Sequence, residues 1–267
     1  HRNRCSLRLL GARVSLEWPL VAALGAASFV GALVQAATGF GYAILAAPVF
    51  LWAMNSTRAM AVLVGLHLVQ SAMMVPRLLQ HVDRRRLGLL AAGALVGCPL
   101  GLAILLRLDL SVLKIAVGIV ILLAAALLIA REIGLIGARP RSEASPRPAL
   151  TGATGIASGL LTALLVMPGP PLMLLAAADR LPRDVTRALS LTFFALCYAF
   201  VTALYTASGT FDREAALVTL LLAPTAALGT LIGARAANAL GESRFRAAVL
   251  TLLVLSGAGA LAAGLRG

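Results

Sequence analysis

Acidic residues are scarce in this chain: 10 of its 267 residues are Asp or Glu, against 23 Lys or Arg, and charged residues make up only 12% of it. Cysteine is equally rare, and Cys5, Cys98 and Cys197 lie far apart in the sequence without a metal-binding or redox spacing. The one lysine, Lys114, follows no Gly-rich loop, which excludes a nucleotide-binding P-loop. We therefore expect no metal and no other cofactor.

The scarcity of acidic residues also argues against an enzyme. All ten lie at the ends of apolar segments or between them, which excludes a carboxylate proton relay inside a membrane. Isolated cysteines and a single histidine within an apolar segment supply no nucleophile with a base and no metal site. The net charge of +13 would suggest nucleic acid in a soluble protein. No basic helix with interleaved aromatic residues is present, so we expect no nucleic acid and ascribe the charge to arginines in loops at an anionic membrane surface.

Apolar residues are abundant instead, at 60% of the chain, which is typical of polytopic membrane proteins. A bilayer core of about 30 Å is spanned by roughly 20 apolar helical residues. The charges divide the chain into eight uncharged runs: residues 18–57, 59–76, 87–106, 115–130, 148–178, 188–211, 215–234 and 247–265. Most runs fit one span. We predict an all-α polytopic integral membrane protein with about eight hydrophobic units.

Two of these runs, 18–57 and 148–178, are too long for one span, and each contains a break. The first break is Gln35-Ala-Ala-Thr38-Gly39-Phe40-Gly41-Tyr42, where two close glycines weaken a helix. The second is Met167-Pro168-Gly169-Pro170-Pro171, which cannot continue a helix because proline lacks the amide hydrogen. Broken backbone at membrane depth is tolerated where protein buries it or where it lines a polar cavity.

We predict that the two breaks face each other and form a substrate site. Each break leaves unpaired N–H groups and a positive dipole end where its second arm begins, near Gly41 and near Pro171, and such ends bind anions. Gln35 and Thr38 add hydrogen-bonding side chains. The alternative is that the breaks only shape helix packing. The predicted substrate-binding residues are Gln35, Thr38, Gly39, Phe40, Gly41, Tyr42, Pro168, Gly169, Pro170 and Pro171.

Matches among the scarce charged residues indicate an internal duplication. A shift of 129 places Thr57-Arg58-Ala59 on Thr186-Arg187-Ala188 and Asp83-Arg84 on Asp212-Arg213. We predict a basic N-terminal segment (1–17), a first transmembrane repeat (18–130), a Pro/Arg/Ser linker (131–149) and a second transmembrane repeat (150–267).

Each repeat is expected to hold a broken or re-entrant hairpin and three spans. This odd number would invert the second half relative to the first, as in many transporters. The count of basic residues on the two sides does not decide the orientation. Gly97-x-x-x-Gly101 and Gly229-x-x-x-Gly233 are small-xxx-small patterns, which we interpret as sites of close helix packing.

Three further residues are candidates for gating or coupling. His67 is the one titratable side chain within a predicted span that could protonate near neutral pH. It either carries a coupling proton or, as we expect for a histidine with no carboxylate partner, is a neutral residue hydrogen-bonded inside the bundle. Arg58 and Arg187 occupy equivalent repeat positions at the mouths of spans. They either attract anions from opposite faces or anchor the helices at the interface.

The chain resembles the TauE/SafE family of membrane transporters. The resemblance rests on the first break through Ala43 with Pro48, on Gly169-Pro170-Pro171-Leu172, and on Leu181-Pro182-Arg183-Asp184 followed by Arg187-Ala188, and it covers roughly residues 20–265. Pro168 stands where members often have Ser or Thr. The resemblance implies a multi-pass secondary transporter of the cell (inner) membrane that exports or takes up sulfite, an organosulfonate or a related small anion. The expected partners are that anion and the lipid bilayer, and the alternative is an anion channel or a non-transporting membrane subunit.

Overall fold

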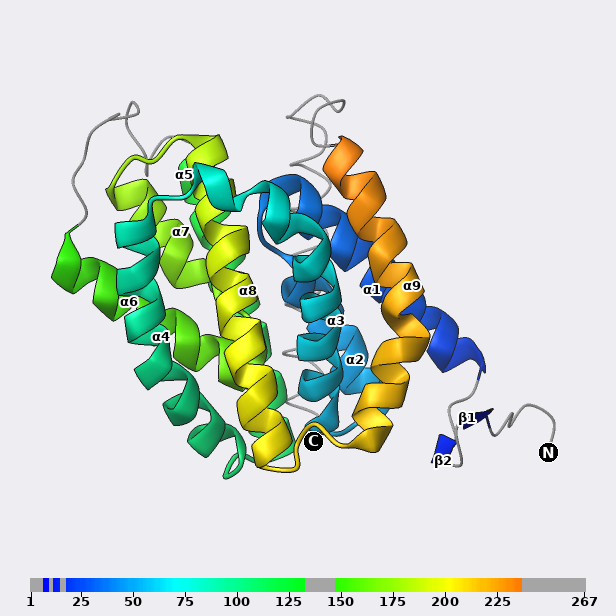
Figure 1. Ribbon diagram of the computed structural model, residues 1–267. Coiled ribbons are helices and arrows are strands. Elements are labelled where there is room, and N and C mark those ends of the chain that lie inside the picture. The colour runs from blue at the N-terminus through cyan, green and yellow to red at the C-terminus, as the bar shows by residue number, and fades with distance from the viewer. Residues whose placement is uncertain (1–6, 10–11, 15–17, 133–146, 237–267) are drawn as a thin grey trace.

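The computed structural model describes residues 7–9, 12–14, 18–132 and 147–236, and within these ranges the chain is helical apart from one short hairpin (Figure 1). That hairpin pairs β1 (Leu7–Leu9) with β2 (Ala12–Val14) in antiparallel fashion. The first half contains α1 (Trp18–Thr38), α2 (Tyr42–Met54), α3 (Arg58–Met74), the short 3-10 turns η1 (Val75–Arg77) and η2 (Leu79–His81), α4 (Arg84–Leu105) and α5 (Leu110–Glu132). The second half contains α6 (Pro148–Leu165), α7 (Gly169–Ala178), α8 (Arg183–Ala207) and α9 (Arg213–Ala236). The predicted span 247–265 and most of the predicted linker lie outside the described residues.

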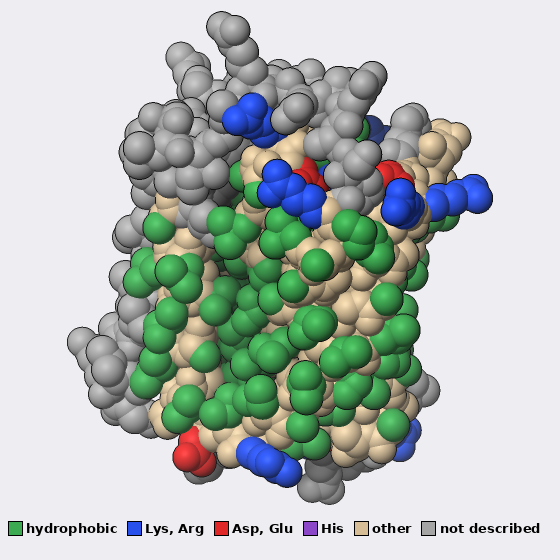
Figure 2. Space-filling view, turned by 90° about the vertical axis from the view of Figure 1, so that its left-hand side faces the viewer, with side chains coloured by type: hydrophobic (Ala, Val, Ile, Leu, Met, Phe, Trp, Pro, Cys, Tyr) green, Lys and Arg blue, Asp and Glu red, His purple; other side chains and the backbone are tan. Residues whose placement is uncertain are grey.

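Six of the described helices, α1, α3, α4, α6, α8 and α9, are long and apolar enough to cross a membrane. Helices α2 and α7 are shorter, at 13 and 10 residues. Apolar side chains cover the middle of the face seen in Figure 2, and the charged side chains visible there lie toward its two ends. This distribution confirms the predicted class, a polytopic helical membrane protein.

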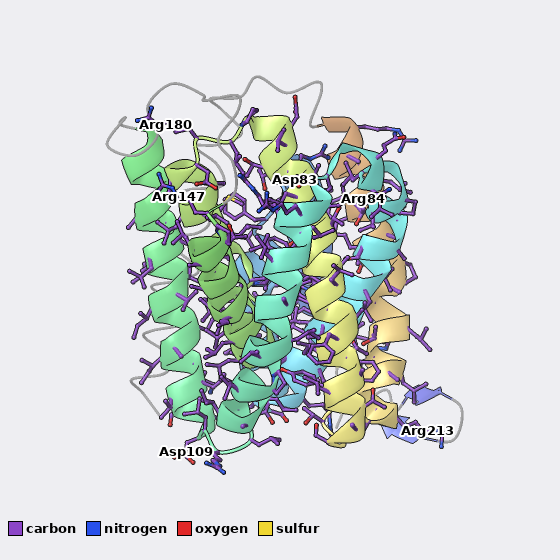
Figure 3. The ribbon with its side chains drawn as sticks, turned by 60° about the vertical axis from the view of Figure 1, so that its left-hand side comes forward. Asp83, Arg84, Asp109, Arg147, Arg180 and Arg213 are labelled. Atoms are coloured by element: carbon purple, nitrogen blue, oxygen red, sulfur yellow. The ribbon has the colours of Figure 1, made fainter. Side chains whose placement is uncertain are left out.

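Both long apolar runs fold as two helices joined at the predicted break. Arg147, at the start of α6, and Arg180, just after α7, lie at the same end of the molecule as Asp83, whereas Asp109 and Arg213 lie at the opposite end (Figure 3). We call these the Asp83 end and the Asp109 end. The α6–α7 hairpin therefore opens toward the Asp83 end.

The α1–α2 hairpin opens the other way. Arg58, which follows α2 after a short turn, pairs with residues at the start of α9, so α2 ends at the Asp109 end. Gly25 of α1 adjoins Thr225 of α9, and Phe29 adjoins Gly229. Helices α1 and α9 are thus parallel, and both begin at the Asp109 end.

Helices of one half pack against helices of the other. α4 packs along α6, and α9 packs along α1. A Cβ on Gly97 would overlap the carbonyl of Ile156, and a Cβ on Gly229 would overlap that of Phe29. These glycines are required for the close approach, as the small-xxx-small patterns predict. The internal duplication and the inverted arrangement of the two repeats stay predictions.

Several helices begin before the uncharged run that marked them in the sequence, α5 at Leu110 and not at residue 115 among them. Helix α8 begins at Arg183, after Pro182, and not at Ala188. An uncharged run shows only which residues lie in the apolar part of the membrane. A helix can extend beyond that part, and the charged first turn of α8 was therefore not predicted. As a consequence Arg187 lies on the helix itself and can reach α1.

Candidate functional site

The first break is a turn that only glycine adopts without strain. Helix α1 ends at Thr38, Gly39 has φ +93° and Gly41 has φ +111°, both in the left-handed region. A Cβ on Gly39 would also lie 3.2 Å from the Cα of Arg187. The two glycines therefore let the chain reverse between α1 and α2 while α8 packs against the turn.

Two side chains of α1 stabilise this turn. Gln35 is buried, with 3% of its surface exposed, and its Oε1 accepts a hydrogen bond from the Tyr42 N–H at 3.2 Å. The Thr38 Oγ1 lies 2.8 Å from the Val34 carbonyl oxygen and 2.7 Å from that of Phe40, and it accepts the Phe40 N–H at 3.3 Å. The Thr38 hydroxyl is thus engaged by the backbone, and the structure does not direct it at a ligand.

The second break is a left-handed turn followed by a proline-rich helix start. Helix α6 ends at Leu165, Val166 has φ +61°, and α7 begins at Gly169. Pro170 and Pro171 lie in the first turn of α7, where backbone N–H groups have no partner within the helix, so their lack of an N–H costs nothing. Because the two prolines have no N–H, the first turn of α7 has few hydrogen-bond donors. We conclude that the start of α7 would attract an anion mainly through the positive end of its helix dipole.

The two breaks meet. A Cβ on Gly169 would lie 3.5 Å from the Cβ of Phe40. Between the breaks is a small cavity with room for about one water molecule, far smaller than typical ligand pockets. Its lining residues are Gln35, Phe40, Gly41, Ala43, Ile44, Val166, Met167, Pro168, Gly169, Pro170, Phe194 and Tyr198.

Six of the ten predicted substrate-binding residues line this cavity: Gln35, Phe40, Gly41, Pro168, Gly169 and Pro170. The other four, Thr38, Gly39, Tyr42 and Pro171, support the turns around it. Sequence reasoning did not single out Phe194 and Tyr198, because no local signal distinguishes an aromatic residue of α8 that faces the breaks from one that packs elsewhere. The polar groups of the lining are the Gln35 amide, the Tyr198 phenol and the backbone at two helix starts.

His67 lies behind the cavity wall. Its ring is fully buried and stacks between Tyr42 and Tyr198, with ring centroids 4.3 and 4.4 Å away. Its Nδ1 lies 2.6 Å from the Leu63 carbonyl oxygen, which is the hydrogen bond inside the bundle that we expected. Its Nε2 is buried without a hydrogen-bond partner among the described residues, which we did not expect.

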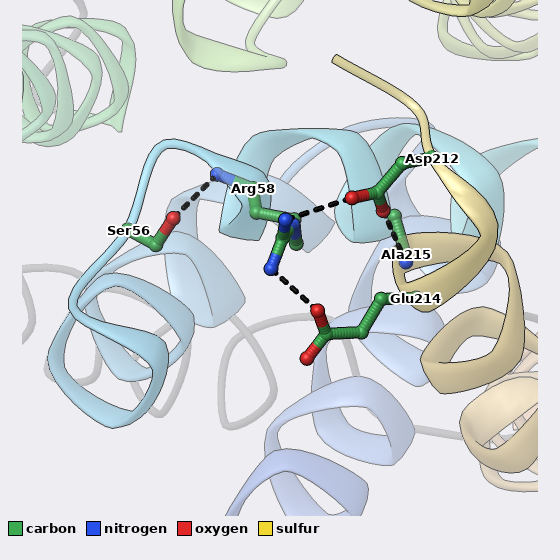
Figure 4. Close-up of polar contacts among 5 residues, drawn as sticks. All are labelled: Ser56, Arg58, Asp212, Glu214 and Ala215. Atoms are coloured by element: carbon green, nitrogen blue, oxygen red, sulfur yellow. Dashed lines mark hydrogen bonds and ion pairs between the residues drawn. The ribbon is translucent and has the colours of Figure 1, made fainter. Parts of the chain in front are cut away.

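Arg187 and Arg58 lie in different surroundings although their sequence positions match. The Arg187 guanidinium donates to the Ala36 carbonyl oxygen in the last turn of α1, through Nε at 3.2 Å and Nη2 at 2.5 Å. A cation is favourable at this C-terminal dipole end, and it lies beside the first break. Arg58 instead pairs with Asp212 at 2.7 Å and Glu214 at 2.6 Å at the Asp109 end (Figure 4).

Two buried contacts were not predicted from the sequence. Asp179 lies at the end of an apolar segment, directly after α7, as expected, yet its side chain is 1% exposed and pairs with that of Arg86 of α4, 3% exposed, at 3.3 Å. Cys98 and Cys197 are distant in sequence, but both are buried and their thiols interact between α4 and α8. Neither contact has a signal in the sequence, because each depends on how α4 packs.

The fold and the site together define a polytopic helical membrane protein in which two oppositely directed hairpins meet at a small cavity. Over residues 23–260 the chain matches the family described as Sulfite exporter TauE/SafE, and it belongs to that family. The family implies a membrane transporter of the sulfite or sulfur-compound type, which agrees with the expectation that the protein is not an enzyme. No curated protein and no solved structure matches the chain.

Proposed function

We propose that this protein is a secondary transporter that moves a small anion, sulfite or an organosulfonate, across the cell (inner) membrane. The observation that carries the proposal is the shared cavity where α2 and α7 both begin. Two helix starts direct two positive dipole ends at one place. The residues that line it include no Asp or Glu to repel an anion.

Charge and shape favour an anion with an apolar part. Arg187 places a positive charge beside the first break without occupying the cavity. The Phe40, Phe194 and Tyr198 side chains lining the cavity suit a hydrocarbon group, and Gln35 suits an oxygen of the anion. We therefore expect an organosulfonate to compete better than sulfite.

The small volume supports a transporter over a channel. A cavity with room for about one water molecule between two hairpins has to widen before it takes an organic anion. In transporters with inverted repeats, one repeat moves against the other around such a central site. A channel would instead need a continuous pore.

Flux into proteoliposomes containing the full chain tests this function. The panel is methanesulfonate, p-toluenesulfonate, sulfite, acetate and potassium, with protein-free vesicles as the control. We expect saturable uptake of sulfonate or sulfite with counterflow. Flux that neither saturates nor shows counterflow would identify a channel, and cation transport without competition by any anion would overturn the proposal.

A further inference from the structure

We propose that His67 is a proton-binding site that couples transport, so that one proton accompanies each anion in the same direction. This inference rests on the proposed anion site and adds a proton, bound at His67, as the second species that the protein transports. The proton binds the Nε2 lone pair from water on one side of the membrane and forms an imidazolium. It leaves to water on the other side, which regenerates the neutral ring, so no bond other than N–H forms or breaks.

The hydrogen bond at Nδ1 determines which nitrogen takes this proton. A carbonyl oxygen only accepts, so at 2.6 Å from the Leu63 carbonyl the Nδ1 atom carries the hydrogen of the neutral ring. Nε2 then has a free lone pair. Buried polar atoms are normally paired, and a buried nitrogen without a partner among the described residues requires a reason. A role in binding a proton would explain why Nε2 has no partner among the residues that the structure describes.

The surroundings of the ring suit an imidazolium that exists only part of the time. Tyr42 and Tyr198 flank it at 4.3 and 4.4 Å, and aromatic faces stabilise a cation. Tyr198 also lines the anion cavity, and so does Gln35, whose Oε1 accepts the Tyr42 N–H. The proton site is therefore one side chain behind the anion site.

Among the described residues, no fixed charge faces His67 from the helices packed against α3. Helix α1 contains no titratable residue, and Tyr42 is the one titratable residue of α2. On α8, the Tyr198 ring is tilted against the imidazole, Cys197 faces Cys98, and the Tyr205 hydroxyl donates to the Ala163 carbonyl oxygen. Arg183, Asp184 and Arg187 lie in the first two turns of α8. The charged residues of α9, Arg213, Glu214 and Arg235, lie at its two ends.

Because His67 has no fixed charge facing it from the described helices, the proton and the anion are expected to strengthen each other's binding. A buried imidazolium with no anion nearby is costly, and an anion in the cavity is stabilised by a cation behind it in addition to Arg187 beside the first break. Each ligand thus raises the affinity of the other, and the effect is reciprocal. Proton and anion therefore bind together and leave together, which is symport and not exchange.

The test combines binding and flux for the whole protein, with p-toluenesulfonate and sulfite as probes. In weakly buffered detergent solution, binding of p-toluenesulfonate, which stays fully ionised, to the unmodified protein should take up about one proton per bound anion. In proteoliposomes at zero membrane potential, a pH gradient that is acid outside should drive uphill uptake. His67→Asn and His67→Gln should bind no proton with the anion and lose uphill uptake while downhill flux remains. Ser71→Ala, one turn further along α3, is the control and should behave as the unmodified protein.

The outcomes separate this inference from the proposed function. Anion binding without proton uptake, or proton uptake that persists in the His67 variants, overturns the inference and leaves an anion transporter. Absence of binding or flux for every anion of the panel overturns the proposed function and the inference with it. If neither His67 variant folds, the proton count on the unmodified protein still decides whether a proton accompanies the anion.

Discussion

Gln35 combines two roles in one amide, because it holds the start of α2 and also lines the cavity. Gln35→Glu keeps an oxygen for the Tyr42 N–H and adds a negative charge where the anion binds. We expect the fold to persist and the KM for the anion to rise at least tenfold, or about 1.4 kcal/mol of binding free energy. Initial-rate uptake over a range of anion concentrations measures this.

The matched control is Asn55→Asp, which makes the same chemical change at the other end of α2. Asn55 is exposed and accepts a hydrogen bond from Lys114, so a carboxylate is tolerated there. Its KM should be unchanged. Equal KM values for Gln35→Glu and the unmodified protein would remove Gln35 from the anion site.

Gly41 is the residue of the first break that both turns the chain and lines the cavity. At its φ of +111° a Cβ is strained by about 1–2 kcal/mol, and it would also lie 3.3 Å from a Val34 methyl group. We expect Gly41→Ala to insert and purify normally but to lose most transport. Gly88→Ala, on an exposed part of α4 where no atom lies within 4 Å of the new Cβ, should be near neutral. Normal flux in Gly41→Ala would count against a site at this break.

At the residue scale the sequence located the break but not the role of each residue in it. Paired glycines in an apolar run have few explanations other than a turn, so Gly39 and Gly41 were predictable. The Thr38 hydroxyl has backbone acceptors two and four residues away that a sequence pattern does not show, and its role in substrate binding stays a prediction.

At the scale of elements, the buried pair of Arg86 and Asp179 fastens the end of α7 to the start of α4. Removal of Arg86 leaves the buried Asp179 carboxylate without its cation, which costs about 3–5 kcal/mol, whereas replacement of both partners of a buried pair by apolar residues is often neutral or stabilising. We expect Arg86→Met or Asp179→Leu alone to lower the thermal unfolding midpoint strongly in detergent micelles. The double variant should recover most of the loss. A double variant as unstable as the sum of the two single ones would mean that the two side chains act independently.

Element pairing shows where sequence reasoning reaches its limit. The bounds of α2, residues 42–54, were predictable because a break and a polar turn delimit one apolar stretch. The packing partner of α4 was not predictable, because Gly97 and Gly101 indicate that another helix packs closely but do not show that this helix is α6. Phe194, Tyr198 and the Arg86–Asp179 pair all depend on such partners, and this is why the cavity was predicted only in part.

At the scale of the whole molecule, the two hairpins open toward opposite ends, and this is the feature that a labelling experiment tests most directly. Arg147 and Arg180 are exposed at the Asp83 end, and Asp109 and Arg213 are exposed at the Asp109 end. We replace each by cysteine in a Cys5→Ala, Cys98→Ala, Cys197→Ala background first shown to transport. Intact cells are then treated with a membrane-impermeant maleimide, before and after permeabilisation.

We expect cysteines at positions 147 and 180 to label from one side of the membrane and cysteines at 109 and 213 from the other. Helix α8, which leads from 180 to 213, is long and apolar enough to cross the membrane once. Labelling of 147 and 213 from the same side would contradict the opposed hairpins and remove the basis for a site between two inverted halves. The expected pattern would also show which end faces the cytoplasm.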